Sequence, residues 1–553
     1  GLVHIRRTTI YRLFAALFAL VLLAAACGDS SDPDDTAGGG DDGDTTETTA
    51  EEAMDEGEPV QGGTLSVAAT SDGDTLDPLA SASFNVHNRV GLASSRLLKP
   101  DMSSEYAFGE APLVGDLAED WEISEDGLTY TFNLRQGVMW HDIAPVSGRE
   151  FVAADVVATF EAIQAGGFQA YMLSPVTSIE APDDYTVVLT LSEPFAPLEN
   201  YMASHHMWIL PQEAFDGGYD PATQVIGTGP FQMVEWDRGV TTVYERNPNY
   251  YEEGIPHVDG VQMPVVADQG ARIAAFRAGE TQLIGAVSPQ ETESLLSALP
   301  EAELVTEISG SPLMIYFNME VAPYDQLEVR QAISMAVDRE GLGEALFGNG
   351  AYPGPVQRSL PVFALPEEEL AEAMPYDPEA AQQMLEDAGV TDLNMSIMVT
   401  AGYGPRIVNA AEWIVEDLAQ VGITAELEVV DYATYIGQRW AGEEYDVGVG
   451  LQTPFQEPDE WLYAQYHTEG SRNWWNISDP ELDALVEEQR TILDEDERIA
   501  QIQDTQRWML ENLMNPLQIW GYDTEVIVGP AVNGYHTQPQ YGFNHYAYLW
   551  LEE

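Results

Sequence analysis

Few residues of this 553-residue chain have the types and spacing that chemistry at a defined site requires. Trp140, His141 and Asp142 stand together and could serve a metal ion or an acid–base pair, and His205 and His206 are adjacent. Adjacent side chains point to different sides of any regular element, so these two histidines are expected to make a poor chelate. The chain has no H-E-x-x-H and no G-x-S-x-G motif. We therefore expect no catalytic residues, no metal site and no cofactor.

The only cysteine, Cys27, is the remaining candidate for chemistry. A single cysteine excludes an intrachain disulfide and a cysteine-cluster metal site. It follows a segment with three arginines and an uncharged apolar run over 13–26, which is short for a membrane span and ends in small residues. The sequence AAAC at 24–27 resembles a bacterial lipobox, whose cysteine is acylated. We predict a lipoprotein signal peptide over 1–26 and a lipid anchor at Cys27; an ordinary signal peptide with an incidental cysteine is the alternative.

The charge balance is strongly acidic, with 93 Asp and Glu against 21 Lys and Arg and a formal net charge of −72. Thirteen of the acids lie between residues 28 and 60, where no base and little apolar surface occurs, so residues 27–60 are predicted to be an acylated, disordered tether. Such a chain repels phosphate backbones and anionic membrane surfaces, which excludes nucleic acid as a partner. The single lysine, Lys99, follows Leu98, so there is no P-loop. The spread of acids along the whole chain suggests a saline habitat.

Beyond the tether, strand and helix patterns alternate. Apolar residues at every second position over 128–134 and 185–191 predict half-buried antiparallel strands. Apolar residues at helical spacing over 329–337 predict a helix. Asp377 and Asp479, each followed by proline, are typical N-caps, and Gly389 suits a helix C-terminus with positive φ. The body is therefore expected to be of the α/β class.

The motifs of the body occur in a specific order. They read GGTLSVA from Gly62, TLDP from Thr75, LAEDWEISEDGLTYTFNLRQGVMWHD from Leu117, FVAADVVATFEAI from Phe151, GTGPF from Gly227, RNPNYY from Arg246, YFNMEVAPYDQLEVRQAISMAVDRE from Tyr316, YDPEAAQQMLEDAG from Tyr376 and YDVGVG from Tyr445. From about residue 61 to the C-terminus this order resembles the extracytoplasmic solute-binding proteins of peptide/nickel-type ABC transporters, solute-binding protein family 5. In that family the segment around Trp140 is a scaffold turn.

The resemblance implies a two-lobed, hinged periplasmic-binding-protein fold of type II, in the large three-domain variant of the peptide binders. It implies that residues 61–100, 225–306 and 518–553 form lobe I, that 101–224 form domain II and that 307–517 form lobe III. Two crossings between lobes, near Ser309 and Pro516, would act as the hinge. An extended ligand that contacts both lobes only when they close would stabilise the closed state.

The implied function is the high-affinity substrate-binding subunit of an ABC importer, held by its lipid anchor on the extracytoplasmic face of the membrane. The implied partners are a small organic solute or short peptide and the permease subunits with their ATPases, and the protein is expected to be a monomer. An extracellular lipoprotein hydrolase is one alternative, since paired carboxylates are not excluded among so many acids. A sensor or adhesin with the same fold but no permease is another.

The ligand positions show a departure from the family. Its peptide-binding members place an aspartate shortly after the YDV strand to pair with the ligand's α-ammonium, and this position is Pro454 here, with Glu457 and Asp459 nearby. A desolvated, unpaired ammonium costs several kcal/mol, so we expect a sugar, a blocked peptide or another neutral extended solute; a nickel chelate is an alternative. By position in the family's cleft, the candidate ligand-binding residues are Ser83, Phe84, Asn85, Ser311, Tyr403, Trp440, Gln452, Thr453, Phe455 and Gln456.

Overall fold

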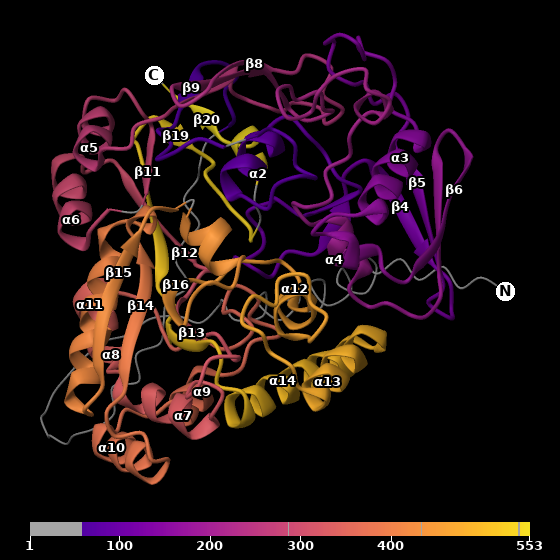
Figure 1. Ribbon diagram of the computed structural model, residues 1–553. Helices are drawn as coiled ribbons and strands as arrows, with labels where there is room; N and C mark the ends of the chain where they lie inside the picture. The colour runs from indigo at the N-terminus through magenta and orange to yellow at the C-terminus, as the bar shows by residue number, and fades with distance from the viewer. Residues whose placement is uncertain (1–57, 74, 286, 433, 540–541, 553) are drawn as a thin grey trace, which may run out of the picture. The chain divides into compact units, whose positions relative to one another are not determined.

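The computed structural model describes residues 58–73, 75–285, 287–432, 434–539 and 542–552. The predicted signal peptide, Cys27 and almost all of the predicted tether lie outside the described residues. Within the described part, helices and strands alternate along the chain and the strands form several separate sheets (Figure 1). None of the described helices is both long and apolar enough to cross a membrane.

Two sheets combine strands from the beginning, middle and end of the described chain. One has the order β1-β10-β9-β8, with β1 parallel to β10 and the other pairs antiparallel. The second, antiparallel sheet has the order β11-β18-β12. The helices α2, α5 and α6 lie in the same parts of the chain as the strands of these two sheets. The bounds are β1 Thr64–Ser66, α2 Phe84–Gly91, β8 Phe231–Asp237, β9 Thr241–Arg246, β10 Gly260–Pro264, α5 Gln269–Arg277, β11 Leu283–Gly285, α6 Pro289–Ala298, β12 Glu303–Ile308 and β18 Asp523–Val528.

A third sheet is built from consecutive segments of the chain and has the order β4-β5-β7-β6. Tyr130 pairs with Leu189 across antiparallel β5 and β7, and Tyr130, Phe132 and Leu134 are all buried. The predicted alternating, antiparallel strands are thus confirmed. The bounds are β2 Leu98–Pro100, β3 Leu113–Gly115, β4 Ala118–Ile123, β5 Thr129–Leu134, α3 Ala153–Ala165, β6 Val176–Asp183, β7 Thr186–Leu191 and α4 Leu198–Met202, of which β2 and β3 form a separate pair.

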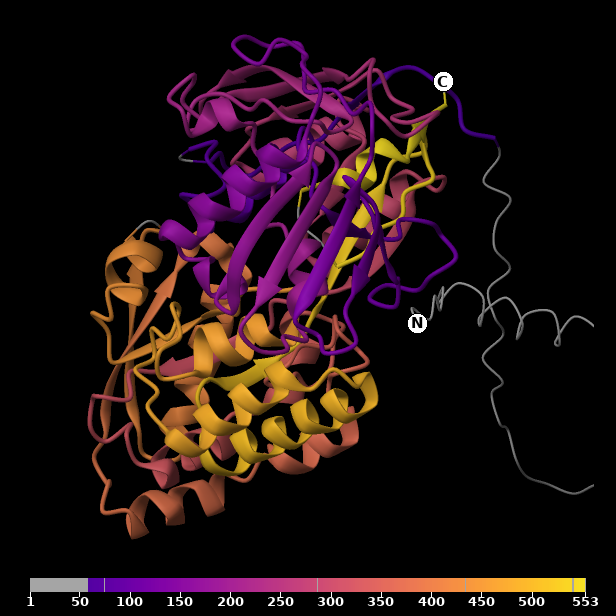
Figure 2. The same cartoon turned by 90° about the vertical axis from the view of Figure 1, so that its right-hand side faces the viewer.

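The largest sheet has five strands in the order β15-β14-β16-β13-β17. β14 runs parallel to β15 and β16, whereas β13 is antiparallel to both of its neighbours. Helices α13 and α14 lie side by side (Figure 1, Figure 2). The bounds are β13 Leu313–Phe317, α7 Leu327–Ala336, α8 Arg339–Leu346, α9 Glu367–Ala373, α10 Pro378–Asp387, β14 Asn394–Thr400, α11 Pro405–Gln420, β15 Thr424–Val430, β16 Val447–Leu451, α12 Pro458–Trp461, α13 Pro480–Thr491, α14 Glu495–Asn512 and β17 Leu517–Trp520; β19 Val532–Asn533 and β20 Trp550–Leu551 pair separately.

The helix signals are confirmed at both predicted N-caps. The side chain of Asp377 accepts a hydrogen bond from the backbone of Ala380 at the start of α10, and Asp479 caps α13 in the same way. Gly389 has a φ of 73° after α10, as its position requires. The apolar stripe of α7 is buried in the core of the five-stranded sheet, so helical spacing predicted both the helix and its inner face.

Within the described residues, the chain crosses twice between the three-stranded and the five-stranded sheet. The first passage, from β12 to β13, covers residues 309–312, close to the predicted Ser309. The second lies at 521–522, because β17 still pairs with β13 and only β18 belongs to the other sheet. The prediction of a crossing near Pro516 is therefore wrong by the length of β17, since the apolar residues after Pro516 continue the five-stranded sheet.

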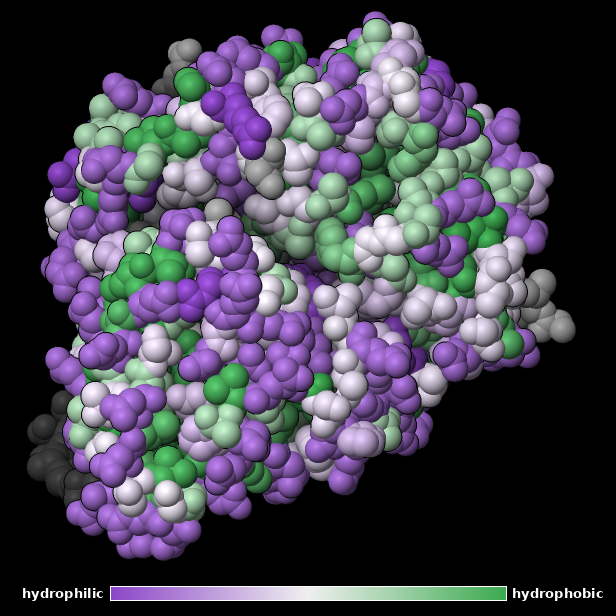
Figure 3. Space-filling view, viewed as in Figure 1, coloured by the Kyte–Doolittle hydropathy of each residue, from purple (hydrophilic) through white to green (hydrophobic). Residues whose placement is uncertain are grey.

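Acidic residues are distributed over the whole body. Removing the charges of residues 1–60, three arginines and thirteen acids, leaves −62 for the rest of the chain. Figure 3 shows hydrophilic residues widely spread over the visible face, with hydrophobic patches between them. Like charges repel one another in the compact state, and salt shortens the screening length from about 30 Å at 0.01 M to about 3 Å at 1 M.

We therefore expect the melting temperature of the protein to rise as NaCl is increased from about 0.01 M to 1 M. Differential scanning calorimetry at constant pH measures this directly, with the same series in a neutral osmolyte as the control. A melting temperature that is flat or falls with NaCl would contradict the expectation of adaptation to a saline habitat.

Candidate functional site

The 452–456 loop, which follows β16, carries four of the predicted ligand-binding residues. The indole Nε1 of Trp461, in α12, donates to the carbonyl oxygen of Thr453 at 2.9 Å and so holds the loop against the next helix. Gly310, in the first passage between the sheets, packs tightly on the loop: a Cβ at Gly310 would lie 2.9 Å from Cβ of Pro454. The loop is therefore in contact with a segment through which the chain passes from one sheet to another.

Both acids that follow the position of the missing aspartate are buried and paired. The carboxylate of Glu457 accepts from the guanidinium of Arg498, and Asp459 forms an ion pair with Arg490 at 3.2 Å. Side chains of α4 donate to both carboxylates. Glu457 and Asp459 therefore bind the protein itself, and Pro454 offers no side-chain acceptor in their place.

A buried cation, Arg472, lies beside the loop and was not among the predicted site residues. Its Nη2 donates to Oγ1 of Thr453 at 3.1 Å, and its guanidinium carbon lies 5.2 Å from the ring centroids of both Phe455 and Trp474. The Nε and Nη1 atoms are buried and have no hydrogen-bond partner within the described part of the chain. Burial lowers the pKa of Arg472.

Three histidines gather next to Phe455 in the described part of the chain. His205 and His206 lie in a turn after α4 rather than in a regular element, and their ring centroids are 4.0 Å apart. His87, from α2, packs edge-on against them at 5.1 and 4.9 Å, and the ring of His206 lies 6.5 Å from that of Phe455. The turn thus brings together rings that a helix or strand would have separated. Burial lowers the pKa of His87 to about 4 and holds the pKa of His205 and His206 well below 6.5.

Glu460, in α12, connects the histidines to the 452–456 loop. Its Oε2 lies 3.5 Å from Nδ1 of His206, and its Oε1 accepts from the backbone of Gln456 at 3.4 Å. Burial raises the pKa of Glu460 to about 8, so the carboxyl is mostly protonated at neutral pH. We call the set of side chains formed here the Arg472 cluster; its members are His87, His205, His206, Phe455, Glu460 and Arg472.

The aromatic candidates Tyr403 and Trp440 belong to a chain of rings that leads toward Arg472. Both pack against Tyr435, at 5.7 and 6.0 Å between ring centroids, and Trp440 meets Trp474 edge-on at 5.2 Å. Trp440 is buried and Tyr403 half-buried. The ring chain therefore connects these two predicted residues to the cluster through Trp474.

The remaining candidates are placed less centrally. The amide of Gln452 is fully buried and engaged by Gln357 and Gln518, so it serves the core behind the loop. Gln456 is half-buried, and its amide N and O have no partner among the described residues. Ser83, Phe84 and Asn85 are half-buried at the start of α2. Ser311 is half-buried in the first passage between sheets.

Trp140 and His141 support the scaffold. The indole of Trp140 donates to the buried Asp155 at 3.2 Å, and the ring of His141 makes hydrogen bonds with the backbone of Gly227 and Gly229. A Cβ at Gly227 would overlap the carbonyl oxygen of Ala93, which explains a glycine at this contact. Among the described residues no group of three or more His, Cys, Asp or Glu side chains is arranged to hold a metal ion, and this includes the histidines of the Arg472 cluster.

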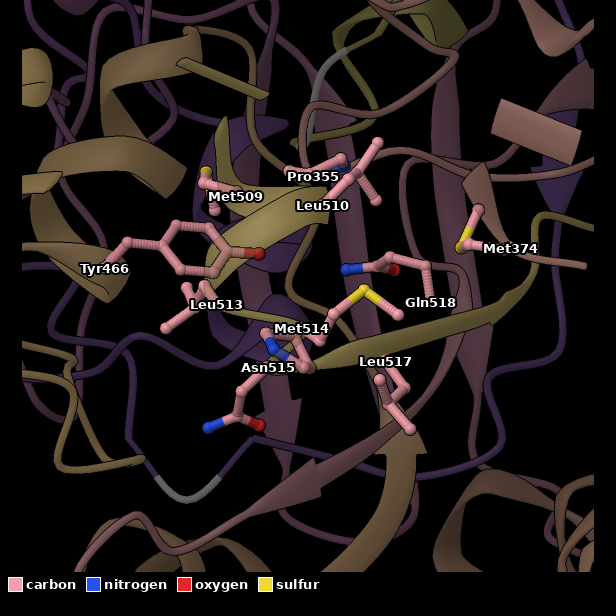
Figure 4. A pocket seen from close by; sticks show the side chains of 11 residues that line it. Pro355, Met374, Tyr466, Met509, Leu510, Leu513, Met514, Asn515, Leu517 and Gln518 are labelled. Carbon is pink, nitrogen blue, oxygen red and sulfur yellow. The ribbon is translucent and has the colours of Figure 1, made fainter. Parts of the chain in front are cut away.

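A crevice near β17 is too small to hold an organic solute. It is lined by methionines, leucines and Tyr466 (Figure 4), and the space open to a water-sized molecule is ≈ 10 Å³. A water needs about 10–15 Å³. This crevice is a packing gap in the core and is not a candidate site.

The comparisons with known proteins identify the class. The family model described as "Bacterial extracellular solute-binding proteins, family 5 Middle" matches residues 112–473. The chain belongs to this family, which confirms the resemblance in the motif order. Among curated proteins, it is 29% identical to "Di/tripeptide-binding protein 2" of Pseudomonas aeruginosa, over 74% of this chain and 81% of that protein. It is 28% identical to "Heme-binding protein A" of Haemophilus influenzae, over 71% and 76%.

Solved structures show the same fold. The binding protein AgaA of A. tumefaciens R10 in complex with agropinic acid matches with a TM-score of 0.77 and 26% identity, over 89% of this chain and 99% of that chain. The periplasmic binding protein DppA of Helicobacter pylori in complex with the peptide STSA matches with a TM-score of 0.79 and 23% identity over the same shares. The expected periplasmic-binding-protein fold is confirmed.

Proposed function

We propose that this chain is the substrate-binding subunit of an ABC importer, which captures an extended organic solute outside the cell membrane and delivers it to permease subunits and their ATPases. The observation that carries the proposal is the Arg472 cluster, where α2, the turn after α4, the 452–456 loop and α12 bring buried polar groups together. Elements this far apart in sequence meet at one place, as a site that is assembled by closure requires.

The proposed moving parts follow the sheets. Lobe I comprises 61–100, 225–306 and the segment from β18 onward; domain II comprises 101–224; and lobe III extends from β13 to β17. The passages at 309–312 and 521–522 are the proposed hinge, because only there does the chain pass between the three-stranded and the five-stranded sheet in the described residues. A solute that contacts both lobes would favour the closed form by its differential affinity.

The ligand we propose is peptide-like or oligosaccharide-like and lacks a free α-ammonium group. The similarity to di/tripeptide-binding proteins supports a peptide-like backbone. Pro454, together with the paired state of Glu457 and Asp459, argues against a buried ammonium at the 452–456 loop. Aromatic faces and amides, as in Phe455 and Gln456, suit neutral parts of such a solute.

Free di- to pentapeptides are therefore expected to bind weakly or not at all, and N-acetylated peptides or oligosaccharides to bind tightly. The measurement is titration calorimetry on protein that has been unfolded and refolded to remove carried-over solute. Tight binding of a plain peptide that is lost on acetylation would contradict this ligand class and would point to Glu460 as the ammonium partner. Glu460→Gln tests that role: it would weaken the binding of a plain peptide if Glu460 is the ammonium partner, and it would leave the binding unchanged if Glu460 is not.

A lipid anchor at Cys27 is part of the proposal. Replacing Cys27 by Ser removes the thiol that would be acylated, so the variant is expected to be released from the membrane or to stay unprocessed. Detergent partitioning and the mass of the mature N-terminus measure this, and Gly28→Ala, which keeps the thiol, is the control that should stay anchored. A Cys27→Ser protein that is correctly processed and still bound to the membrane would contradict the anchor.

A further inference from the structure

Arg472 differs from the buried Arg339 and Arg498 in how its donors are used. Arg339 donates from Nε and both terminal nitrogens to Gln518 and Ser334, and Arg498 donates to Glu457 and Gln489. A guanidinium has five N–H donors. Only the bond from Arg472 to Thr453 has a protein acceptor within the described part of the chain, and its Nε and Nη1 have none.

The surroundings of Arg472 leave its charge unbalanced. No carboxylate of the described residues lies within 4.0 Å of it as an ion-pair partner. The same holds for the buried Arg330 and Arg339, but their guanidinium donors are taken up by backbone carbonyls and by Ser334. Burial keeps Glu460 mostly protonated by raising its pKa, and it keeps the three histidines of the cluster neutral by lowering theirs. Arg472 is thus the one charged member of the cluster at neutral pH.

We propose that Arg472 binds an anionic group of the solute, most simply a carboxylate, beside the position where the family's peptide binders hold an ammonium. This inference rests on the proposed function and narrows its ligand class. A carboxylate matches the planar donors of a guanidinium and can accept two of them at once. The rings of Phe455 and Trp474 keep the guanidinium in place beside the 452–456 loop. This subsite is therefore positively charged, whereas the missing aspartate would make it negatively charged.

The test uses pairs of probes that differ in one carboxylate. N-acetyl di- to pentapeptides are titrated as free acids and as C-terminal amides, and gluco-oligosaccharides are titrated with and without a terminal uronic acid. The wild-type protein is expected to bind the acid of a pair about 10- to 100-fold more tightly than its neutral partner, because a hydrogen bond between charged groups is stronger than one to a neutral acceptor. In Arg472→Met this preference is expected to disappear.

A second readout separates a ligand-binding arginine from a structural one. Arg472→Met removes a buried charge that has no carboxylate partner among the described residues, so the melting temperature without solute is expected to stay the same or rise. Arg507→Met, which removes a half-exposed cation from the same acidic chain, is the control for long-range electrostatics and should keep the preference for acids.

Three results would overturn the inference: equal binding of acids and neutral partners, an acid preference that survives in Arg472→Met, or binding of none of the acids. If none of the acids binds, the protein is denatured and any released solute is identified by mass spectrometry. This shows whether only the anionic subsite is wrong or the proposed function as well. A released neutral solute contradicts only the anionic subsite, whereas the absence of any bound or released solute contradicts the proposed function as well.

Discussion

Replacing Arg498 by Met is expected to lower the free energy of unfolding by about 3–5 kcal/mol, because it leaves a buried carboxylate without its cation. Glu457 is fully buried, and Arg498 is its ion-pair partner. The same carboxylate accepts from Asn200, in α4, so the pair also supports the contact between α4 and the start of α12. Urea denaturation of the mature protein measures the loss.

Two further variants make this result specific. In the double variant Glu457→Gln with Arg498→Met no charge of the pair is left buried, so much of the lost stability is expected to return. Arg507→Met breaks a half-exposed surface pair with Glu369 and should cost about 0–1 kcal/mol. Equal losses for Arg498→Met and Arg507→Met would show that the buried pair has no special role.

Between pH 7 and pH 5 the wild-type protein is expected to lose about 2 kcal/mol more of its free energy of unfolding than the variant His545→Phe. Burial lowers the pKa of His545 to about 3, so the folded protein keeps this ring neutral over that range. The unfolded chain, with a pKa near 6.5, takes up the proton as the pH falls. Stability linked to His545 is therefore present above about pH 6.5 and is lost as the pH falls toward 3.

Urea denaturation at both pH values gives this difference. Phe543→Leu, in the same ring cluster, changes packing without changing proton uptake, so it should lower stability equally at pH 7 and pH 5. A pH difference that is the same in wild type and His545→Phe would contradict the burial of a neutral imidazole.

The local structure was largely predictable from the sequence, because its signals act over a few residues. Period-two apolar patterns identified β5 and β7, and Asp377 and Asp479 identified the starts of two helices. The second passage between sheets was misplaced, because strand pairing depends on a distant partner: β17 continues the five-stranded sheet through its contact with β13.

The site was only partly predictable. The motif order pointed to Thr453 and Phe455, which do contact Arg472, but Arg472, His87 and Glu460 were missed. Their roles depend on burial and on neighbours far away in sequence, although the adjacent His205 and His206 and the scarcity of cations were available signals. The rule that adjacent side chains diverge applies to regular elements and gives no expectation for these two histidines, which occupy a turn.

Small-angle X-ray scattering with and without the tightest-binding N-acetyl peptide or oligosaccharide tests the central claim most directly. If the chain captures its solute by closing about the passages at 309–312 and 521–522, saturation with that solute is expected to reduce the radius of gyration. With an acidic solute at a concentration that saturates the wild-type protein but lies below the weakened Kd of the variant, Arg472→Met should show little reduction. Saturating binding that leaves the radius of gyration of the wild-type protein unchanged would contradict capture by hinge closure.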